Sequence, residues 1–333
     1  MSVNVAVVGA TGAVGQEFLT VLAERNFPIK NLKLLASARS AGKTVSFKGQ
    51  DYTIEELTKD SFKGVQIALF SAGGSISKEF GPAAVAAGAI VVDNSSAFRM
   101  KDGIPLVVPE VNPEQIQKHA GLIANPNCST IIMNVPVWPL HKVNRVKRMV
   151  ISTYQAVSGA GAWGLYELDA QIKSYAAGQP IAKEKFPHPI VNNLFSHNSK
   201  VAENGYNEEE NKMVNETRKI FGDPKIMVTA TCVRVPVPRA HCEAINIEFE
   251  RPMTPQQVRD ILAKAPGVKI VDDPANNHFP MPAEASGQDA VLVGRIRQDI
   301  SRDDGRGIDL FVSGDQIRKG AATNAVQIAE RLI

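Results

Sequence analysis

The stretch VNVAVVGATGAVG, residues 3–15, determines the fold predicted for the first part of the chain. It begins with a nearly continuous apolar run, which is typical of a strand buried in a parallel sheet. Three glycines follow with the spacing G-x-x-G-x-x-G, a variant of the usual dinucleotide-binding pattern. Such glycines let the backbone approach a pyrophosphate at the N-terminus of the next helix. The alternative is a tight turn that binds no ligand.

The pattern of alternating strands and helices continues beyond the glycines. Apolar residues at helical spacing come first, and further strands are predicted at residues 31–36, 66–71, 89–93 and 121–124, with a helix at about 75–87. This alternation predicts an α/β domain with a parallel sheet of the Rossmann type.

The residues after the second predicted strand indicate which dinucleotide binds. Proteins that bind NAD usually have Asp or Glu there, which hydrogen-bonds the ribose 2′-hydroxyl. This chain instead has SARSAGK, residues 37–43, with two cations and no acid. We therefore expect NADP, with its 2′-phosphate near Arg39 and Ser40. The alternative for Arg39 is a solvated loop cation.

A second informative stretch is ANPNCST, residues 124–130. Asn127 can cap a helix that begins near Cys128. A thiol at a helix N-terminus is stabilised as a thiolate by free N–H groups and the helix dipole, and a thiolate is a nucleophile. The alternative is a small buried hydrophobic residue, as most free cysteines are.

The pattern changes after Cys128. Helices are predicted at about residues 161–177 and 209–221, and strands at 146–154, 226–235, 243–249, 291–298 and 307–313. This order predicts a second α+β domain with a mostly antiparallel mixed sheet, for catalysis and dimerisation. A closing helix, residues 316–333, is expected to pack back on the first domain. The predicted division is therefore residues 1–127 with 314–333 for the dinucleotide-binding domain, and 128–313 for the second domain.

Polar residues follow several of the predicted strands. Arg99 comes soon after a strand of the first domain, where ligands gather in α/β sheets, so it is placed to meet an anion. Gln155 and Arg234 end strands of the second domain, and His241 begins one because prolines interrupt the chain before it. A single arginine is more often a surface group and a single histidine more often structural, so these positions remain hypotheses at this point.

Composition limits the class of protein. The 333 residues are 44% hydrophobic and 21% charged, with a net charge of +3 and no polybasic block, which argues against nucleic acid as a partner. Three cysteines make no disulfide framework and have no metal-ligand spacing, so we expect no metal and a reducing, cytoplasmic location. A strand is predicted directly after the start, leaving no room for a signal peptide, and no apolar run has transmembrane length.

Several motifs taken together resemble the aspartate-semialdehyde dehydrogenase family, most closely its bacterial branch, over essentially the whole chain. The motifs are GATGAVG at residues 9–15, NPNCST at 125–130, QAVSGAG at 155–161 and RVPVPRAH at 234–241. The resemblance implies NADP-dependent reduction of L-aspartyl 4-phosphate to L-aspartate 4-semialdehyde, for lysine, methionine and threonine synthesis. It also implies a homodimer built on the second domain.

The resemblance also implies catalytic roles. Cys128 would hold the substrate as an acyl-thioester, His241 would be the acid/base, and Gln155 would orient the substrate. Acyl transfer from phosphate to sulfur requires an activated thiol, a proton carrier and donors for the oxyanion of the tetrahedral intermediate, which backbone N–H groups near Cys128 could supply in part.

Substrate contacts are implied at charged positions. Arg234 would bind the α-carboxylate, Arg99 and Lys212 the phosphate, and Glu209 the amino group, with Gln155 beside them. Glu209 lies in a run of three acids, so either acidic neighbour could take its place, and all three could be a solvated helix start favoured by the dipole.

Cofactor contacts are implied in both domains. The implied NADP contacts are Gly9, Thr11, Gly12, Ala13, Val14, Arg39, Ser40, Ser158, Gly159 and Gln316. The two remaining cysteines, Cys232 and Cys242, are taken as structural.

Two other kinds of protein share part of this pattern. An N-acetyl-glutamyl-phosphate reductase resembles this family but has Gly-Cys-Tyr-Pro at the nucleophile, whereas this chain has NCST at residues 127–130. A non-catalytic NADP-sensing protein would have no use for Cys128 together with Gln155, Arg234 and His241.

Overall fold

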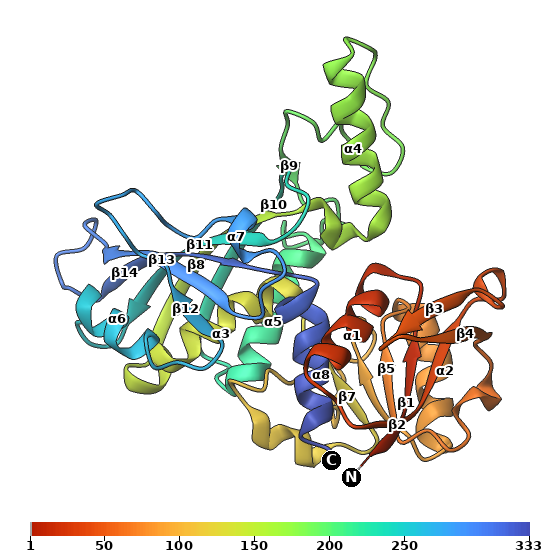
Figure 1. Ribbon diagram of the computed structural model, residues 1–333. Helices are drawn as coiled ribbons and strands as arrows, with labels where there is room; N and C mark the ends of the chain where they lie inside the picture. The colour runs from red at the N-terminus through yellow and green to blue at the C-terminus, as the bar shows by residue number, and fades with distance from the viewer. Residues whose placement is uncertain (1) are drawn as a thin grey trace. The chain divides into compact units, whose positions relative to one another are not determined.

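The computed structural model describes residues 2–333, which form two compact units (Figure 1). One consists of the residues up to Asn127 together with Ala321–Ile333, and the other is Cys128–Gly320. The predicted second boundary, after residue 313, differs from the observed one, which lies between Gly320 and Ala321. Residues 314–320 belong to the second unit because Asp315 and Gln316 hydrogen-bond to its residues Arg239 and Ala240.

The first unit contains a seven-stranded sheet in which all neighbouring strands are parallel except the β3–β4 hairpin. In sheet order the strands are β3 (Thr44–Phe47), β4 (Gln50–Glu56), β2 (Ile29–Ala36), β1 (Val3–Val8), β5 (Ile67–Phe70), β6 (Ile90–Asp93) and β7 (Leu122–Ala124). The chain runs outward from β1 on one side and then returns to β5 on the other. The predicted Rossmann-type topology is confirmed, with its ligand-binding crevice expected at the carboxyl ends of β1 and β5.

Helices cover both faces of this sheet. The helices are α1 (Ala13–Glu24), α2 (Gly74–Ala86) and α8 (Thr323–Glu330). Apolar residues of α1 and α8 share one buried cluster with β1 and β2, and α2 contributes to the cluster on the other face. The closing helix therefore packs on the first unit as predicted, although α8 begins later, after a π-helical turn at Arg318–Ala322.

The second unit contains a seven-stranded mixed sheet. In sheet order its strands are β12 (Val268–Ile270), β13 (Val291–Gln298), β14 (Gly307–Gly314), β11 (His241–Phe249), β8 (Val146–Gln155), β10 (Met227–Arg234) and β9 (Phe195–Ser196). Neighbours are antiparallel except the pairs β12–β13 and β8–β10. This confirms the predicted mostly antiparallel sheet.

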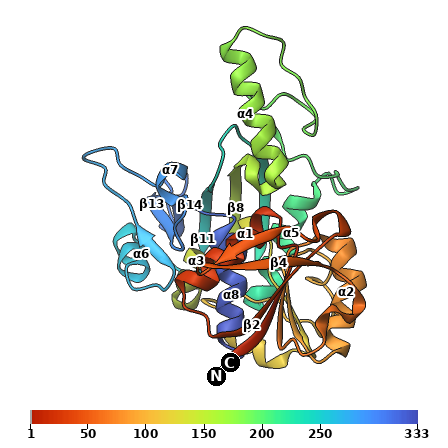
Figure 2. The same cartoon turned by 45° about the vertical axis from the view of Figure 1, so that its right-hand side comes forward.

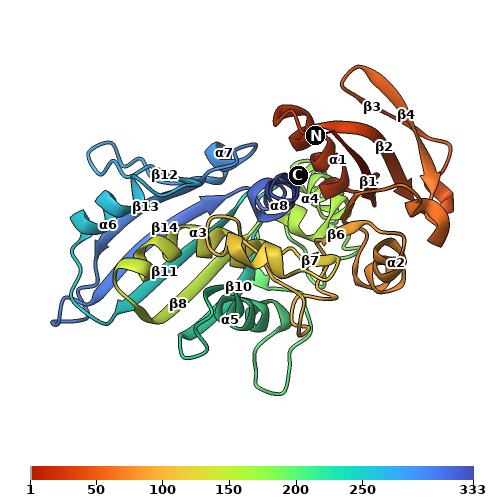
Figure 3. The same cartoon turned by 90° about the horizontal axis from the view of Figure 1, so that it is seen from below.

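One layer of helices covers one face of this sheet, as Figure 3 shows. The layer consists of α3 (Cys128–Val143), α5 (Glu208–Phe221) and α6 (Pro255–Leu262), and a short helix, α7 (Pro282–Ala285), precedes β13. Helix α3 is the central one because it contacts both α5 and α6, and nearly all of its first ten residues are buried. The start of α3 therefore lies at the end of a fully packed element.

Helix α4 (Ala162–Ala176) projects from the sheet of the second unit, as Figure 2 shows. A small apolar cluster that includes Leu168, Phe186 and Phe195 joins it to the segment that returns from it. The buried carboxylate of Glu167 accepts hydrogen bonds from the backbone N–H groups of residues 184–186. This segment leads into β9, which pairs with the end of β10.

Short 3-10 turns connect several elements, at Ala38–Ser40, Lys59–Phe62, Pro113–Lys118 and Val157–Ala160. Within residues 2–333, no helix combines the length and apolar character needed to cross a membrane.

Candidate active site

Cys128 is the first residue of α3, where the sequence predicted a helix to begin. Its side chain is partly exposed. The backbone of Gly320 passes so close that a Cβ there would lie 2.9 Å from the Cβ of Cys128. The sulfur is thus held at a helix N-terminus, an environment that favours the thiolate.

His241 faces the sulfur from the first position of β11. Its Nε2 lies 3.6 Å from Sγ of Cys128, and its Nδ1 accepts a hydrogen bond of 3.0 Å from the backbone N–H of Ala156. Because Nδ1 is an acceptor, the ring hydrogen of the neutral imidazole is on Nε2 and points toward the sulfur. Complete burial, with Arg234 nearby, lowers the pKa of His241 well below its usual 6.5. The pair is therefore arranged for a thiolate that accepts a hydrogen bond from neutral imidazole.

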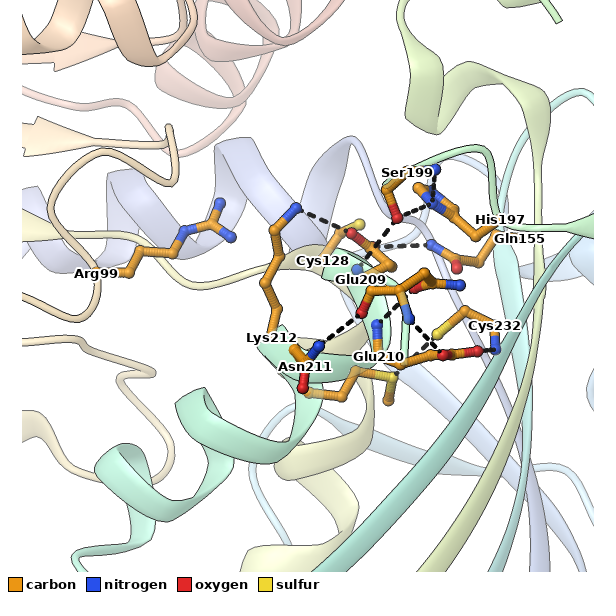
Figure 4. A network of polar contacts seen from close by, with 12 residues as sticks. Arg99, Cys128, Gln155, His197, Ser199, Glu209, Glu210, Asn211, Lys212 and Cys232 are labelled. Atoms are coloured by element: carbon orange, nitrogen blue, oxygen red, sulfur yellow. Dashed lines mark hydrogen bonds and ion pairs between the residues drawn. The ribbon is translucent and has the colours of Figure 1, made fainter. Parts of the chain in front are cut away.

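Gln155 ends β8 and is fixed from two sides. Its Nε2 donates to Oε1 of Glu209 at 3.1 Å, and its Oε1 accepts from the Thr153 hydroxyl at 3.1 Å. The side chain is 1% exposed. These bonds determine which end of the amide is the donor, and Figure 4 shows the amide directed at Glu209.

The start of α5 distinguishes the three consecutive acids. Glu210 forms a capping box with Asn207 and also accepts from the backbone N–H of Cys232, so its carboxylate is occupied by the backbone. Glu208 is exposed. Glu209 is buried, and its Oε2 lies 3.2 Å from Nζ of Lys212 one helical turn later. The geometry thus favours Glu209 among the three.

Arg234 ends β10 beside Gln155 and is only 2% exposed. Its Nη1 donates to the carbonyl of Ala156 and its Nη2 bonds to Nε2 of His197, each at 2.7 Å. Its Nε has no hydrogen-bond partner among residues 2–333, which is unusual for a buried N–H group. A buried guanidinium with an unused donor is equipped to receive an anionic group.

Gly159 makes the approach of these groups possible. A Cβ at this position would lie 3.1 Å from both Nη1 of Arg234 and Nε2 of His241. Any side chain there would displace one of the two groups.

Ser158 and Gln316 brace the turn that precedes His241. The Gln316 amide donates to the Ser158 hydroxyl, which donates in turn to the carbonyl of Pro238. The Gln316 Oε1 accepts from the backbone N–H of Ala240 at 2.8 Å, and Ala240 has a left-handed φ of 70°. The predicted contact of Ser158, Gly159 and Gln316 with the cofactor stays a prediction.

The glycine-rich turn of the first unit has room only for glycine at positions 9 and 15. Gly9 has a φ of 83°, and a Cβ there would lie 3.0 Å from the backbone of Ser71. A Cβ on Gly15 would lie 2.1 Å from the Gly9 carbonyl. Gly12 is the N-cap of α1, so no side chain covers that helix N-terminus. Thr11, Ala13 and Val14, the other predicted contacts in this turn, are exposed or partly exposed. A pyrophosphate fits such a cradle.

Arg39 and Ser40 lie in the 3-10 turn that directly follows β2. Arg39 is exposed and forms no ion pair within the described chain, whereas Ser40 is buried. An exposed cation at the end of the second strand is available for a 2′-phosphate.

Arg99 is held by backbone carbonyls in the first unit. Its Nε donates to the carbonyl of Asn125 and its Nη2 to that of Asn94, each at 2.9 Å. Asn94 follows β6 and Asn125 follows β7, so Arg99 lies at the carboxyl edge of the sheet as predicted.

Within the second unit, the structure brings most of the predicted catalytic and substrate-binding residues together. They are Cys128, Gln155, Glu209, Lys212, Arg234 and His241. A thiol, a neutral imidazole, an amide and a mixed set of charges suit covalent acyl transfer with an amino-acid substrate. His197 and Ser199, which join this network, were not predicted, because a lone histidine in the polar run SHNSK has no distinguishing pattern.

The other two cysteines are buried. Burial raises the pKa of Cys232 far above its usual value and that of Cys242 to about 11. Cys232 contacts the sulfur of Met213, and Cys242 contacts the Ser313 hydroxyl. Their surroundings fit the predicted structural role.

Comparison with known proteins gives full-length similarities. Residues 4–119 match the family model described as semialdehyde dehydrogenase, NAD binding domain, and residues 137–319 match semialdehyde dehydrogenase, dimerisation domain. The chain is 56% identical to aspartate-semialdehyde dehydrogenase of Synechocystis sp., over 99% of this chain and 97% of that protein. It is 54% identical to that of Aquifex aeolicus, over 100% and 98%. The crystal structure of aspartate semialdehyde dehydrogenase II from Vibrio cholerae complexed with ASA is 47% identical, with a TM-score of 0.97 over 100% of this chain and 98% of that one.

Proposed function

The chain belongs to the aspartate-semialdehyde dehydrogenase family. From this premise we propose that its cofactor is NADP, and we propose a role in the reaction for each residue of the site. It is an oxidoreductase that interconverts L-aspartyl 4-phosphate and L-aspartate 4-semialdehyde with a nicotinamide cofactor, in amino-acid biosynthesis. The single observation that supports the residue roles is the contact of 3.6 Å between the Cys128 sulfur and a histidine whose hydrogen points at it.

The proposed catalytic cycle begins with attack of the Cys128 thiolate on the acyl carbon of aspartyl 4-phosphate. A carbon–sulfur bond forms, the bond from the acyl carbon to the phosphate oxygen breaks, and phosphate leaves with the electron pair. The glycine-rich turn at residues 9–15 would hold the reduced cofactor, which would supply the hydride that reduces the thioester. No proton transfer from the neutral ring is required: His241 would donate a hydrogen bond from Nε2 to the oxyanion and then to the departing thiolate. Of the acid and base roles implied for His241, this geometry supports the role of donor, because neither ring nitrogen is left to accept a proton from the thiol.

The remaining charged groups are proposed to hold the substrate. The Arg234 guanidinium would pair with the α-carboxylate, because a planar fork matches a carboxylate. Glu209 would accept from the α-amino group, and Gln155, which Glu209 orients, would position the acyl group. Arg99 and Lys212 would bind the phosphate.

A test of these assignments in the reverse direction measures the KM of aspartate semialdehyde and the KM of phosphate separately. Losing one charge-assisted contact costs roughly 1.5–3 kcal/mol, or about 10- to 150-fold in affinity. We expect Arg234→Ala to raise mainly the KM of the semialdehyde, and Arg99→Ala and Lys212→Ala mainly that of phosphate. Arg234→Lys keeps the charge but loses the fork, so it should still impair the semialdehyde. An Arg234→Ala variant altered only in its phosphate KM would mean that the substrate binds the other way round.

The choice of NADP is supported by Arg39 and Ser40 at the end of β2, in the absence of an acid within residues 37–43. Arg39→Asp would repel the 2′-phosphate and could accept the ribose hydroxyl. It should weaken NADP binding about 10-fold or more, measured as Kd, and change NAD binding much less.

Lys43→Asp is the matched control for Arg39→Asp, because it makes the same change of charge in the same loop. Its effect on NADP should be clearly smaller. Equal losses of NADP and NAD affinity in Arg39→Asp would show that Arg39 supports the loop or the adenine rather than the 2′-phosphate.

A homodimer built on the second unit is also proposed. Helix α4 exposes Tyr166, Ile172 and Tyr175 at 74%, 47% and 59% of their surface. Exposed apolar side chains of this size on one projecting element are typical of a protein interface.

The absence of disulfides among the three cysteines fits a reducing compartment such as the cytoplasm.

The proposed function is tested by assaying the purified chain with aspartate semialdehyde, phosphate and NADP. Formation of NADPH that requires all three is the expected result. Equal or higher activity with NAD would contradict the cofactor assignment, and activity with N-acetyl-glutamate semialdehyde in place of aspartate semialdehyde would contradict the substrate.

A further inference from the structure

His197 contacts the guanidinium that is proposed to bind the α-carboxylate. The segment from β9 carries it to the end of β10, where its backbone N–H donates to the carbonyl of Cys232 at 2.8 Å. Its Nε2 lies 2.7 Å from Nη2 of Arg234. The carbonyl of Ala156 receives Nη1 of the same guanidinium. Two acceptors on different elements therefore fix the plane of the Arg234 fork.

The partners of His197 determine which of its nitrogens carries the hydrogen. Arginine has only donors, so Nε2 must be the acceptor in the contact with Arg234. The hydrogen is then placed on Nδ1, which lies 3.1 Å from the Ser199 hydroxyl and donates to it, whereas the backbone N–H of Ser199 approaches Nδ1 at the longer distance of 3.3 Å. This arrangement requires a neutral ring.

The surroundings of His197 keep it neutral. Burial lowers its pKa to about 4, and the cations Arg234 on β10 and Lys212 on α5 act in the same direction, against the opposing carboxylate of Glu209. His241 on β11, which is itself neutral, and the thiols of Cys128 and Cys232 are further titratable groups near Arg234. The ring therefore remains an acceptor throughout the neutral pH range.

The same contacts extend to the group proposed to bind the α-amino nitrogen. The Ser199 hydroxyl, which accepts from His197, also accepts from the backbone N–H of Glu209 at 3.3 Å (Figure 4). A continuous chain of hydrogen bonds thus runs from Arg234 through His197 and Ser199 to the first turn of α5. This chain joins Arg234, proposed to bind the α-carboxylate, to Glu209, proposed to bind the α-amino group.

We propose that His197 is a positioning residue, and that with Ser199 it sets the spacing between Arg234 and Glu209 that selects substrates with adjacent amino and carboxylate groups. This inference rests on the roles proposed above for Arg234 and Glu209. His197 touches neither the sulfur nor the reacting carbon. Its removal should therefore affect recognition of the amino acid more than the chemical step or the other substrates.

Two variants of His197 separate this role from a general structural one. His197→Gln can place an amide oxygen near the position of Nε2 and keep an acceptor for Arg234, whereas His197→Leu has similar bulk and no acceptor. We expect His197→Leu to raise the KM of aspartate semialdehyde about 10-fold, because a hydrogen bond to a charged group is lost. The KM values of phosphate and NADP should stay within about twofold, and His197→Gln should recover most of the loss.

Discrimination gives a second measurement. Succinate semialdehyde has the carboxylate and aldehyde of the substrate but no amino group. The ratio of kcat/KM for aspartate semialdehyde to that for succinate semialdehyde should fall about 10-fold in His197→Leu. Ser199→Ala, which interrupts the same chain at the next residue, should lower the ratio in the same direction, so the proposal is still tested if His197→Leu does not fold.

His278→Leu is the matched control, since His278 is exposed and bonded to Glu284 away from this network. It should leave all three KM values and the ratio unchanged. The proposal is overturned if His197→Leu keeps the wild-type KM and ratio, if it raises the KM of all three substrates alike, or if His197→Gln is no better than His197→Leu. Wild-type protein with no activity would instead overturn the proposed function.

Discussion

Replacing Cys128 with serine is expected to lower kcat on the order of 10⁴-fold while leaving the Kd of NADP close to that of the wild type. The reason is the state of the neighbouring imidazole. The Nδ1 of His241 accepts from Ala156, so Nε2 carries a hydrogen and cannot readily take one from a hydroxyl. A thiol can lose its proton to solvent at a helix N-terminus and act as a thiolate, whereas a serine hydroxyl at the same place stays protonated.

The other cysteines provide matched controls for this result. Cys232→Ser and Cys242→Ser make the same chemical change at buried sulfurs and should keep kcat within a few-fold of the wild type. Burst kinetics should also distinguish the variants, because only chains with Cys128 can form the acyl-thioester. A Cys128→Ser protein that turns over at the wild-type rate, or loss of turnover in Cys232→Ser or Cys242→Ser, would show that the nucleophile has been assigned to the wrong residue.

Replacing His241 with leucine is expected to lower kcat about 10²- to 10³-fold, the range typical of the loss of one hydrogen-bond donor to an oxyanion. His241→Gln keeps a donor near Nε2 in a different geometry, so it should recover part of the lost rate. His278→Gln changes an exposed histidine in the same way and should have no effect.

The pH profile tests the proposed charge state of His241. The lowered pKa means that the ring gains its second proton only well below pH 6.5. Protonation of His241 should therefore not reduce kcat/KM between pH 6 and 8, and any fall that it causes should come at lower pH. A fall in kcat/KM with an apparent pKa near 6.5 that is absent in His241→Gln would mean that the histidine titrates as an ordinary exposed group.

The fold was predictable because most of its longer helices and strands have a characteristic local sequence pattern. The apolar run of β1 with the glycines after it predicts a Rossmann-type unit, and each longer strand of the second unit lies within a few residues of its predicted position. Strand β9 was not predicted. It has only two residues and exists because the end of β10 offers it a partner, which no local pattern reveals.

The candidate site was predictable where residues at strand and helix ends match a family motif. The choice among the three acids of α5 was left open, although the sequence contained a signal that favours one of them. Asn207 and Glu210 have the spacing of a capping box, which assigns Glu210 to the backbone and turns Glu209 toward Gln155. His197 could not be predicted in this way, because its role depends on a contact with Arg234 that only the folded chain creates.

The unequal burial of the three sulfurs has a consequence for how the folded chain meets electrophiles and oxidants. Cys128 is partly exposed at a helix N-terminus, whereas Cys232 and Cys242 are enclosed and hard to ionise. Alkylating reagents and peroxide react with thiolates that they can reach. Iodoacetamide should therefore add one carbamidomethyl group per chain, and inactivation should follow that single addition. Covalent inhibitors and oxidative damage would therefore act on the same sulfur atom that is proposed to carry out the acyl transfer.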